Sequence, residues 1–146
     1  MEYFLRNFSH VPDAKLSWTP VPTAKSPIRI AAHTALYAGR FAQMIRERRL
    51  PAPENLTEWL AQRDAEEVAI ATREDMERVF RDGTAEVLAA LDTLLPEEIE
   101  SSLDSGQGWS MPMTQLMGLP GWHATLHAGQ IDYLQTCWDD QQVYVG

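Results

Sequence analysis

Apolar residues recur every three or four positions along most of this chain, the spacing of one face of an α-helix. The clearest stretch follows Ser26-Pro27, a good helix start because serine can cap free amides and proline is tolerated at the first helical position. The predicted inner face of this helix comprises Ile30, His33, Leu36, Tyr37, Phe41 and Met44. Residues 1–11 carry Phe4, Leu5 and Phe8 and predict a first helix, and a connection rich in Pro, Ser and Thr follows over 12–25.

Two further long helices are predicted in the second half of the chain. Thr72, with an acidic residue three positions on, is typical of a helix start, and Pro96 marks the end of that helix. Its expected buried stripe is Met76, Phe80, Val87, Leu91 and Leu94, with Gly83 as an unfavourable interruption. The last helix begins near Ser110 and Pro112, and its stripe is Leu116, His123, Leu126, His127, Ile131, Leu134 and Trp138.

The rest of the pattern is less regular. Residues 54–63 predict a short helix, 97–103 one or two further turns, and 104–110 a loop. Gly118 and Gly121 bracket Leu119-Pro120, which predicts a kink or a broken turn early in the last helix. Strand patterns are nearly absent. Four main amphipathic helices with connections long enough to cross the bundle therefore predict an all-α fold, a four-helix bundle with long crossover connections.

Composition agrees with one folded unit. The 146 residues are 45% hydrophobic and 23% charged, which suits a single domain spanning 1–146. The net charge of −9 would repel phosphate groups, so we expect neither nucleic acid nor an anionic membrane surface as a partner. No apolar run has the length of a membrane span. One cysteine, Cys137, cannot form an internal disulfide and is expected to be a buried, inert thiol, and this cysteine usage favours a cytoplasmic location.

Three of the four histidines fall on faces that are otherwise apolar. His123 and His127 are four residues apart, so a helix places both imidazoles on one side, and His33 lies midway along another apolar face. If these two helices pack together, three neutral nitrogens meet and could hold a divalent metal ion, zinc or nickel. Three protein ligands leave a coordination position open for water, a thiolate or a substrate, as in catalytic sites.

A structural role for these histidines is the alternative. A pair of histidines four apart arises by chance in some sequences, and a core histidine is often a hydrogen-bonded structural residue. Burying several unpaired imidazoles would cost free energy that a metal ion recovers, which favours the metal hypothesis. The zinc-peptidase motif H-E-x-x-H is excluded, because Ala124 occupies the position of the glutamate.

The residues around these histidines resemble a known family. Ala31-Ala32-His33, then His123-x-x-x-His127-Ala-Gly129-Gln130-Ile131, and the Leu16-Ser17-Trp18-Thr19-Pro20 connection resemble the DinB-like superfamily over roughly residues 1–140. The resemblance implies a four-helix bundle in which His33, His123 and His127 ligate a metal ion. Characterised members include bacillithiol S-transferases and mycothiol-dependent maleylpyruvate isomerase, so it also implies a low-molecular-weight thiol as co-substrate. A homodimer is a further implication.

Three other residues are candidates for contacts around the site. Gln130, three residues past His127, could hydrogen-bond an imidazole or a metal-bound group, or be a partly exposed polar residue. Tyr37, one turn beyond His33, lines the open side of the site or is a core tyrosine. Arg40, two turns beyond His33, holds a substrate carboxylate or pairs with a nearby acid. Gly129 suggests a close approach of two helices.

Two functions from different classes follow. The first is a metal-dependent enzyme that acts on a small molecule by activating a thiol, as an S-transferase, or water, as a hydrolase. No acidic residue in the periodic stripes stands out as a general base, which favours thiol transfer over hydrolysis. The second is a non-catalytic bundle that binds a metal ion or small ligand, or a structural homodimer with a vestigial metal site.

Overall fold

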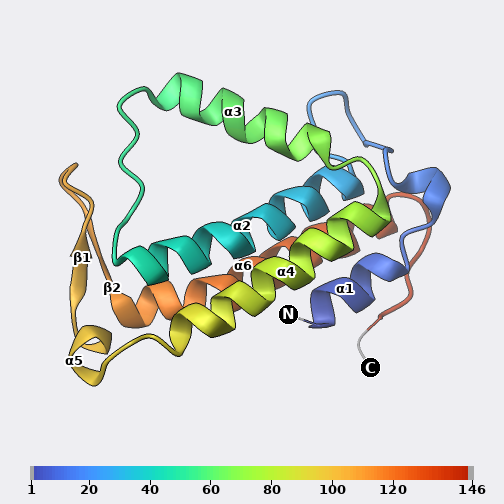
Figure 1. Ribbon diagram of the computed structural model, residues 1–146. Coiled ribbons are helices and arrows are strands. Elements are labelled where there is room, and N and C mark those ends of the chain that lie inside the picture. Colours follow the sequence, from blue (N-terminus) through green and yellow to red (C-terminus); the bar gives the residue numbers. More distant parts are fainter. Residues whose placement is uncertain (1, 145–146) are drawn as a thin grey trace.

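The computed structural model describes residues 2–144 and is dominated by helices (Figure 1). The helices are α1 (Glu2–Ser9), α2 (Pro27–Glu47), α3 (Leu56–Ala69), α4 (Arg73–Leu91), α5 (Pro96–Ile99) and α6 (Met113–Thr136), with a short 3₁₀ turn at Asp13–Lys15. Two strands, β1 (Ser102–Asp104) and β2 (Ser110–Pro112), pair antiparallel in a small hairpin. The predicted helical fold is therefore confirmed, and within the described residues no helix is long and apolar enough to cross a membrane.

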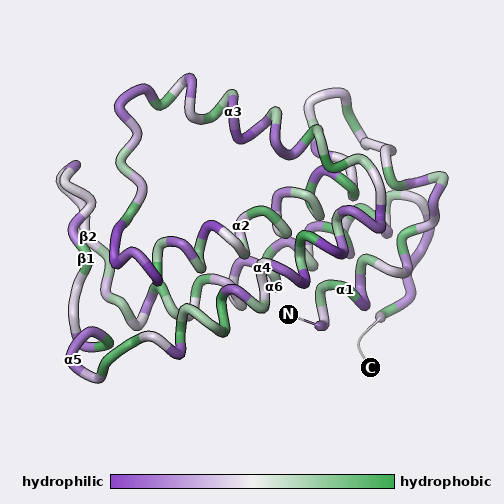
Figure 2. The backbone as a smooth tube through the Cα atoms, in the orientation of Figure 1, coloured by the Kyte–Doolittle hydropathy of each residue, from purple (hydrophilic) through white to green (hydrophobic). Residues whose placement is uncertain are grey.

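Helix α2 is central to the bundle. It packs along α4 and α6, α1 packs against α6, and α3 crosses the side of α2 away from the other helices (Figure 1). One part of the core, around Phe4, Phe8 and Phe80, lies where α1, α2, α4 and α6 meet. A second part, around Phe41, Ile45 and Leu116, lies toward the hairpin. Hydrophobic and hydrophilic segments alternate along the helices (Figure 2).

Glycine allows α2 and α4 to approach closely. A Cβ atom added at the buried Gly83 would lie 2.8 Å from the backbone nitrogen of Gly39 and 2.9 Å from the Cβ of Ala38. Gly83 is thus a contact point between helices, and α4 runs through it without a break. The close approach expected at Gly129 is wrong, because in the described part of the chain no atom of a packing neighbour lies within 4 Å of a Cβ added there.

The helix starts follow the local sequence. The side chain of Thr72 accepts a hydrogen bond from the amide of Asp75 at 3.1 Å, as predicted, and Asn55 does the same for Glu58 at the start of α3. Ser26 precedes α2 and Pro27 opens it, but the Ser26 hydroxyl makes no capping bond; its carbonyl accepts from Ile30 instead.

Several sequence-based boundaries were wrong. Helix α3 extends to Ala69, well past residue 63, α4 ends before Pro96, and the strands were not expected. Helix α6 runs continuously through the buried Pro120, so the broken turn is absent. Leu126, predicted to be buried, is 45% exposed, and Cys137 is exposed because it follows the last turn of α6.

Candidate metal centre

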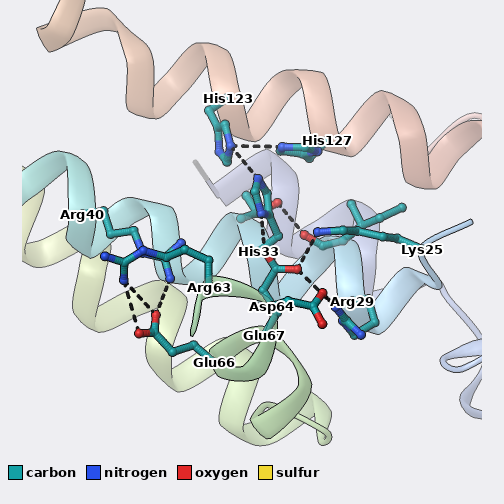
Figure 3. A network of polar contacts seen from close by, with 12 residues as sticks. Lys25, Arg29, His33, Arg40, Arg63, Asp64, Glu66, Glu67, His123 and His127 are labelled. Carbon is teal, nitrogen blue, oxygen red and sulfur yellow. Dashed lines mark hydrogen bonds and ion pairs between the residues drawn. The ribbon is translucent and has the colours of Figure 1, made fainter. Parts of the chain in front are cut away.

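Helices α2 and α6 bring the three predicted histidines together (Figure 3). The Nε2 atom of His123 lies 3.2 Å from Nε2 of His33 and 3.0 Å from Nε2 of His127. His123 is buried, and the other two are partly exposed. The i, i+4 pair on α6 and the single histidine on α2 therefore converge as the helical spacing predicted, in a position to bind a metal ion.

The distances between the nitrogens fit a divalent metal. Two imidazole nitrogens bound tetrahedrally at about 2.0–2.1 Å lie about 3.3 Å apart, close to the observed 3.0 and 3.2 Å. These are Nε2 atoms in all three residues, so the three rings present the same edge to one point.

The protons available at the cluster also favour a cation. Nδ1–H of His33 donates to Oε1 of Glu67 at 2.6 Å, and Nδ1–H of His127 donates to Oε1 of Gln130 at 2.7 Å. A neutral imidazole has one N–H, so the Nε2 atoms of His33 and His127 carry lone pairs. One proton on Nε2 of His123 can bridge only one of its two short contacts. The other contact is left without a bridging proton, so a nitrogen lone pair there has no hydrogen to accept, an arrangement that a shared cation stabilises.

Burial favours the neutral form of the three histidines. Burial lowers the pKa of His123 to about 3, with the neighbouring imidazoles adding to the effect. Burial also lowers the pKa of His33 and of His127, although the hydrogen bonds to Glu67 and Gln130 act in the opposite direction. Neutral imidazoles are the form that ligates a metal ion.

Glu67 is a site residue that the sequence analysis missed. It is the one α3 residue that is buried, at 3% exposure, and besides His33 it contacts Lys25 Nζ at 2.5 Å and Arg29 at 3.5 Å. Burial alone would raise the pKa of Glu67, but the hydrogen bonds from Lys25 and His33 lower it below its usual value. The ionised carboxylate fixes the ring of His33 and its tautomer, as carboxylates do beside metal-binding histidines.

Gln130 lies where its sequence position suggested. Its side-chain oxygen accepts the Nδ1–H of His127, although the residue itself is exposed. It therefore orients His127 as Glu67 orients His33. Among residues 2–144, His123 has no such partner, and its ring packs against Tyr37 and Phe41 at centroid distances of 5.0 and 5.4 Å.

Tyr37 and Arg40 extend the site along α2. The Tyr37 ring lies 4.4 Å from the ring of His33, so Tyr37 forms one wall of the centre. Arg40 pairs with Glu66 on α3 and stacks on Tyr37, its Cζ lying 4.6 Å from the ring centroid. The alternative role of Arg40, pairing with a nearby acid, is thus present in the structure.

Two pockets are lined by residues that contact the histidines, Tyr37 in one and Gln130 in the other. One, of about 360 Å³, lies between α2 and α3 and includes Tyr37 and Arg40. The other, of about 750 Å³ and more open, lies between α6 and the segment before α2, and includes Gln130, Leu126 and Tyr133.

The sequence matches the model of a known protein family over most of its length. The sequence model of the DinB superfamily matches residues 2–131. The chain belongs to the DinB superfamily. The matched region contains all three histidines of this DinB chain, together with Glu67 and Gln130. No curated protein and no solved structure matches it.

Proposed function

We propose that this DinB-superfamily chain is a metal-dependent enzyme that transfers a low-molecular-weight thiol to a small electrophile. The observation that carries the proposal is the set of three converging Nε2 atoms, with too few protons to satisfy one another. Bound zinc or nickel would supply Lewis-acid activation of a thiol or water at a coordination position that the three histidines leave free.

The chain's own residues would hold and shape the centre. His33, His123 and His127 are the ligands, while Glu67 and Gln130 fix the two more exposed rings. Glu67 is the carboxylate in contact with the centre, and its two oxygens are engaged by His33, Lys25 and Arg29. A carboxylate so occupied is a poor general base, which favours the more acidic thiol over water as nucleophile.

The test is turnover by the metal-loaded protein. Zinc- and nickel-loaded samples are assayed for consumption of L-cysteine and glutathione by 1-chloro-2,4-dinitrobenzene. We expect saturable turnover that His127→Ala abolishes while circular dichroism shows an intact bundle. Turnover that survives His127→Ala would overturn the mechanism. A non-catalytic binding bundle instead predicts that metal raises the melting temperature and produces no saturable rate.

A homodimer is a separate proposal, favoured by one face of α6. Trp122, Leu126 and Tyr133 are 61%, 45% and 69% exposed and recur at intervals of four and seven residues, so they lie along one side of the helix. A second copy of the chain would cover this row. Light scattering should give twice the chain mass, reduced to one chain by Leu126→Glu; a single-chain mass for the unmodified protein would contradict the proposal.

A further inference from the structure

The pocket between α2 and α3 concentrates positive charge in an acidic protein. Three arginines line it, Arg40, Arg49 and Arg63, against a single lining carboxylate, Glu47. Glu66 pairs with two of these arginines from the side, and the group remains net positive although the chain carries −9. Such a local reversal of charge attracts small anions, which the rest of the surface repels.

Two of the three arginines, Arg40 and Arg63, stack on aromatic rings. Cζ of Arg40 lies 4.6 Å from the ring centroid of Tyr37, and Cζ of Arg63 lies 5.0 Å from that of Trp59. Arg40 is only 11% exposed. Stacked guanidinium groups lose little further freedom when they bind, because their planes are already fixed.

Arg40 and Arg63 both donate to Glu66 (Figure 3), and each has one further guanidinium N–H group without an acceptor. Glu66 accepts from Nη2 of Arg40 and from Nη1 of Arg63. Nη1 of Arg40 and Nε of Arg63 are enclosed and have no hydrogen-bond partner within residues 2–144. An enclosed guanidinium N–H without an acceptor is unfavourable, so turning either guanidinium toward the pocket that it lines is favoured when a planar carboxylate offers two acceptor oxygens there.

The pocket adjoins the candidate metal centre. His33, Tyr37 and Arg40 lie at positions i, i+4 and i+7 of α2, so they share one face of the helix. Seven residues of α-helix span about 10 Å. Tyr37 contacts the rings of His33 and His123 on one side and Arg40 on the other, so it links the two places.

We infer that the pocket between α2 and α3 binds the carboxylate of a small substrate on Arg40 and Arg63, directing the rest of that molecule past Tyr37 toward the histidines. The inference deepens the proposed function and rests on it for the reaction. The binding itself needs only the arginine pocket. Its volume of about 360 Å³ suits a small organic acid with an apolar or aromatic body packed against Trp59.

The experiment compares an acid with its neutral isostere. Binding of 4-fluorobenzoate and 4-fluorobenzamide is measured by ¹⁹F NMR at low ionic strength, on metal-free and zinc-loaded protein. We expect the acid to bind at least about tenfold more tightly than the amide. Arg40→Gln and Arg63→Gln should each remove most of this preference. Arg78→Gln is the matched control, since Arg78 is an exposed α4 arginine that pairs with Asp75.

Equal affinity for acid and amide would overturn the inference, as would an acid preference that Arg63→Gln leaves unchanged. Metal content of the same samples separates this result from the proposed function. Acid-selective binding by protein that takes up no metal would refute the metal-dependent enzyme and leave the pocket standing. Metal uptake without acid-selective binding would refute the carboxylate pocket and leave the metal-dependent enzyme standing.

A competition experiment identifies which substrate carries the carboxylate. In zinc-loaded protein, 3-mercaptopropionate is compared with propionate as a competitor of 4-fluorobenzoate. If the carboxylate belongs to the thiol, the mercapto acid competes more strongly, and only when metal is present. If it belongs to the electrophile, the two acids compete equally. Failure of both acids to compete would contradict the pocket.

Discussion

The clearest quantitative prediction concerns Glu67, which orients His33. Its buried carboxylate accepts the Nδ1–H of His33 at 2.6 Å and is itself anchored by Lys25 at 2.5 Å. Glu67→Gln leaves one oxygen to accept from His33 but removes the negative charge and turns an NH₂ group toward the ammonium of Lys25. Both changes weaken the hold on His33 and lower the basicity of its Nε2 atom.

Loss of such a partner lowers metal affinity by about 10–100-fold, which corresponds to about 1.4–2.7 kcal/mol. We expect Glu67→Gln to fall near the lower value, because one hydrogen bond survives, and Glu67→Ala near the upper. The assay is competition for zinc between the protein and a chromophoric chelator at neutral pH. Thermal unfolding of the metal-free variants identifies any general loss of folding.

Glu66→Gln is the matched control. Glu66 is the adjacent α3 residue and pairs with Arg40 and Arg63, but it makes no contact with a histidine. Its replacement should leave zinc affinity close to that of the unmodified protein. The reasoning is refuted if folded Glu67→Gln binds zinc as tightly as the unmodified protein, or if Glu66→Gln weakens binding equally.

Three further predictions concern the packing of α4 on α2, the buried imidazole of His123 and the thiol of Cys137. Gly83→Ala should destabilise the protein by about 1–3 kcal/mol through overpacking against α2. Gly129→Ala, with open space around it, should be neutral or stabilising by up to about 1 kcal/mol. Urea unfolding measures both variants, and equal effects would contradict the contact assigned to Gly83. Metal-free protein should lose stability as the pH falls below about 6.5, because the unfolded chain protonates His123 there while the folded pKa is about 3. At pH 5 this one group accounts for about 2 kcal/mol, which His123→Phe should remove from the pH dependence. Cys137 should react with Ellman's reagent in the folded protein, since it is exposed; protection until unfolding would show that it is covered.

Most of the fold could be predicted from regular amphipathic patterns in the sequence. The stripes of α1, α2, α4 and α6 face a common core, so periodicity located these helices, and the Thr72 start was correct to the residue. Helix α3 was predicted too short because its contacts with α2 are largely ionic. Its buried residue is Glu67, and no apolar stripe marks the side that faces the site.

Part of the candidate site could be predicted from the sequence, and part could not. The histidine cluster followed from helical spacing, because His123 and His127 must share a face and His33 lies on a facing helix. The partners of these rings required tertiary information. Gln130 could be proposed from its place near His127, whereas nothing in the sequence indicates which of the 21 acidic residues reaches His33.

Glycine and proline illustrate a second limit. A helical glycine signals either a close contact or open space, and here Gly83 is the contact while Gly129 is the open position. The segment around Pro120 was expected to kink or break α6, and the helix continues through it without a break, with the proline buried. The same local sequence is compatible with a close contact or open space at a glycine, and with a broken or continuous helix at a proline. Only the packing of neighbouring helices decides between these outcomes.

The central claim is that His33, His123 and His127 hold a metal ion, and metal content tests it most directly. Plasma mass spectrometry is performed on untagged protein after exposure to zinc or nickel and removal of excess, with His123→Ala treated identically. The account predicts about one equivalent of metal per chain in the unmodified protein, as expected for one three-histidine centre, and essentially none in the variant. Absence of metal from both proteins after reconstitution, or equal metal in both, would contradict it.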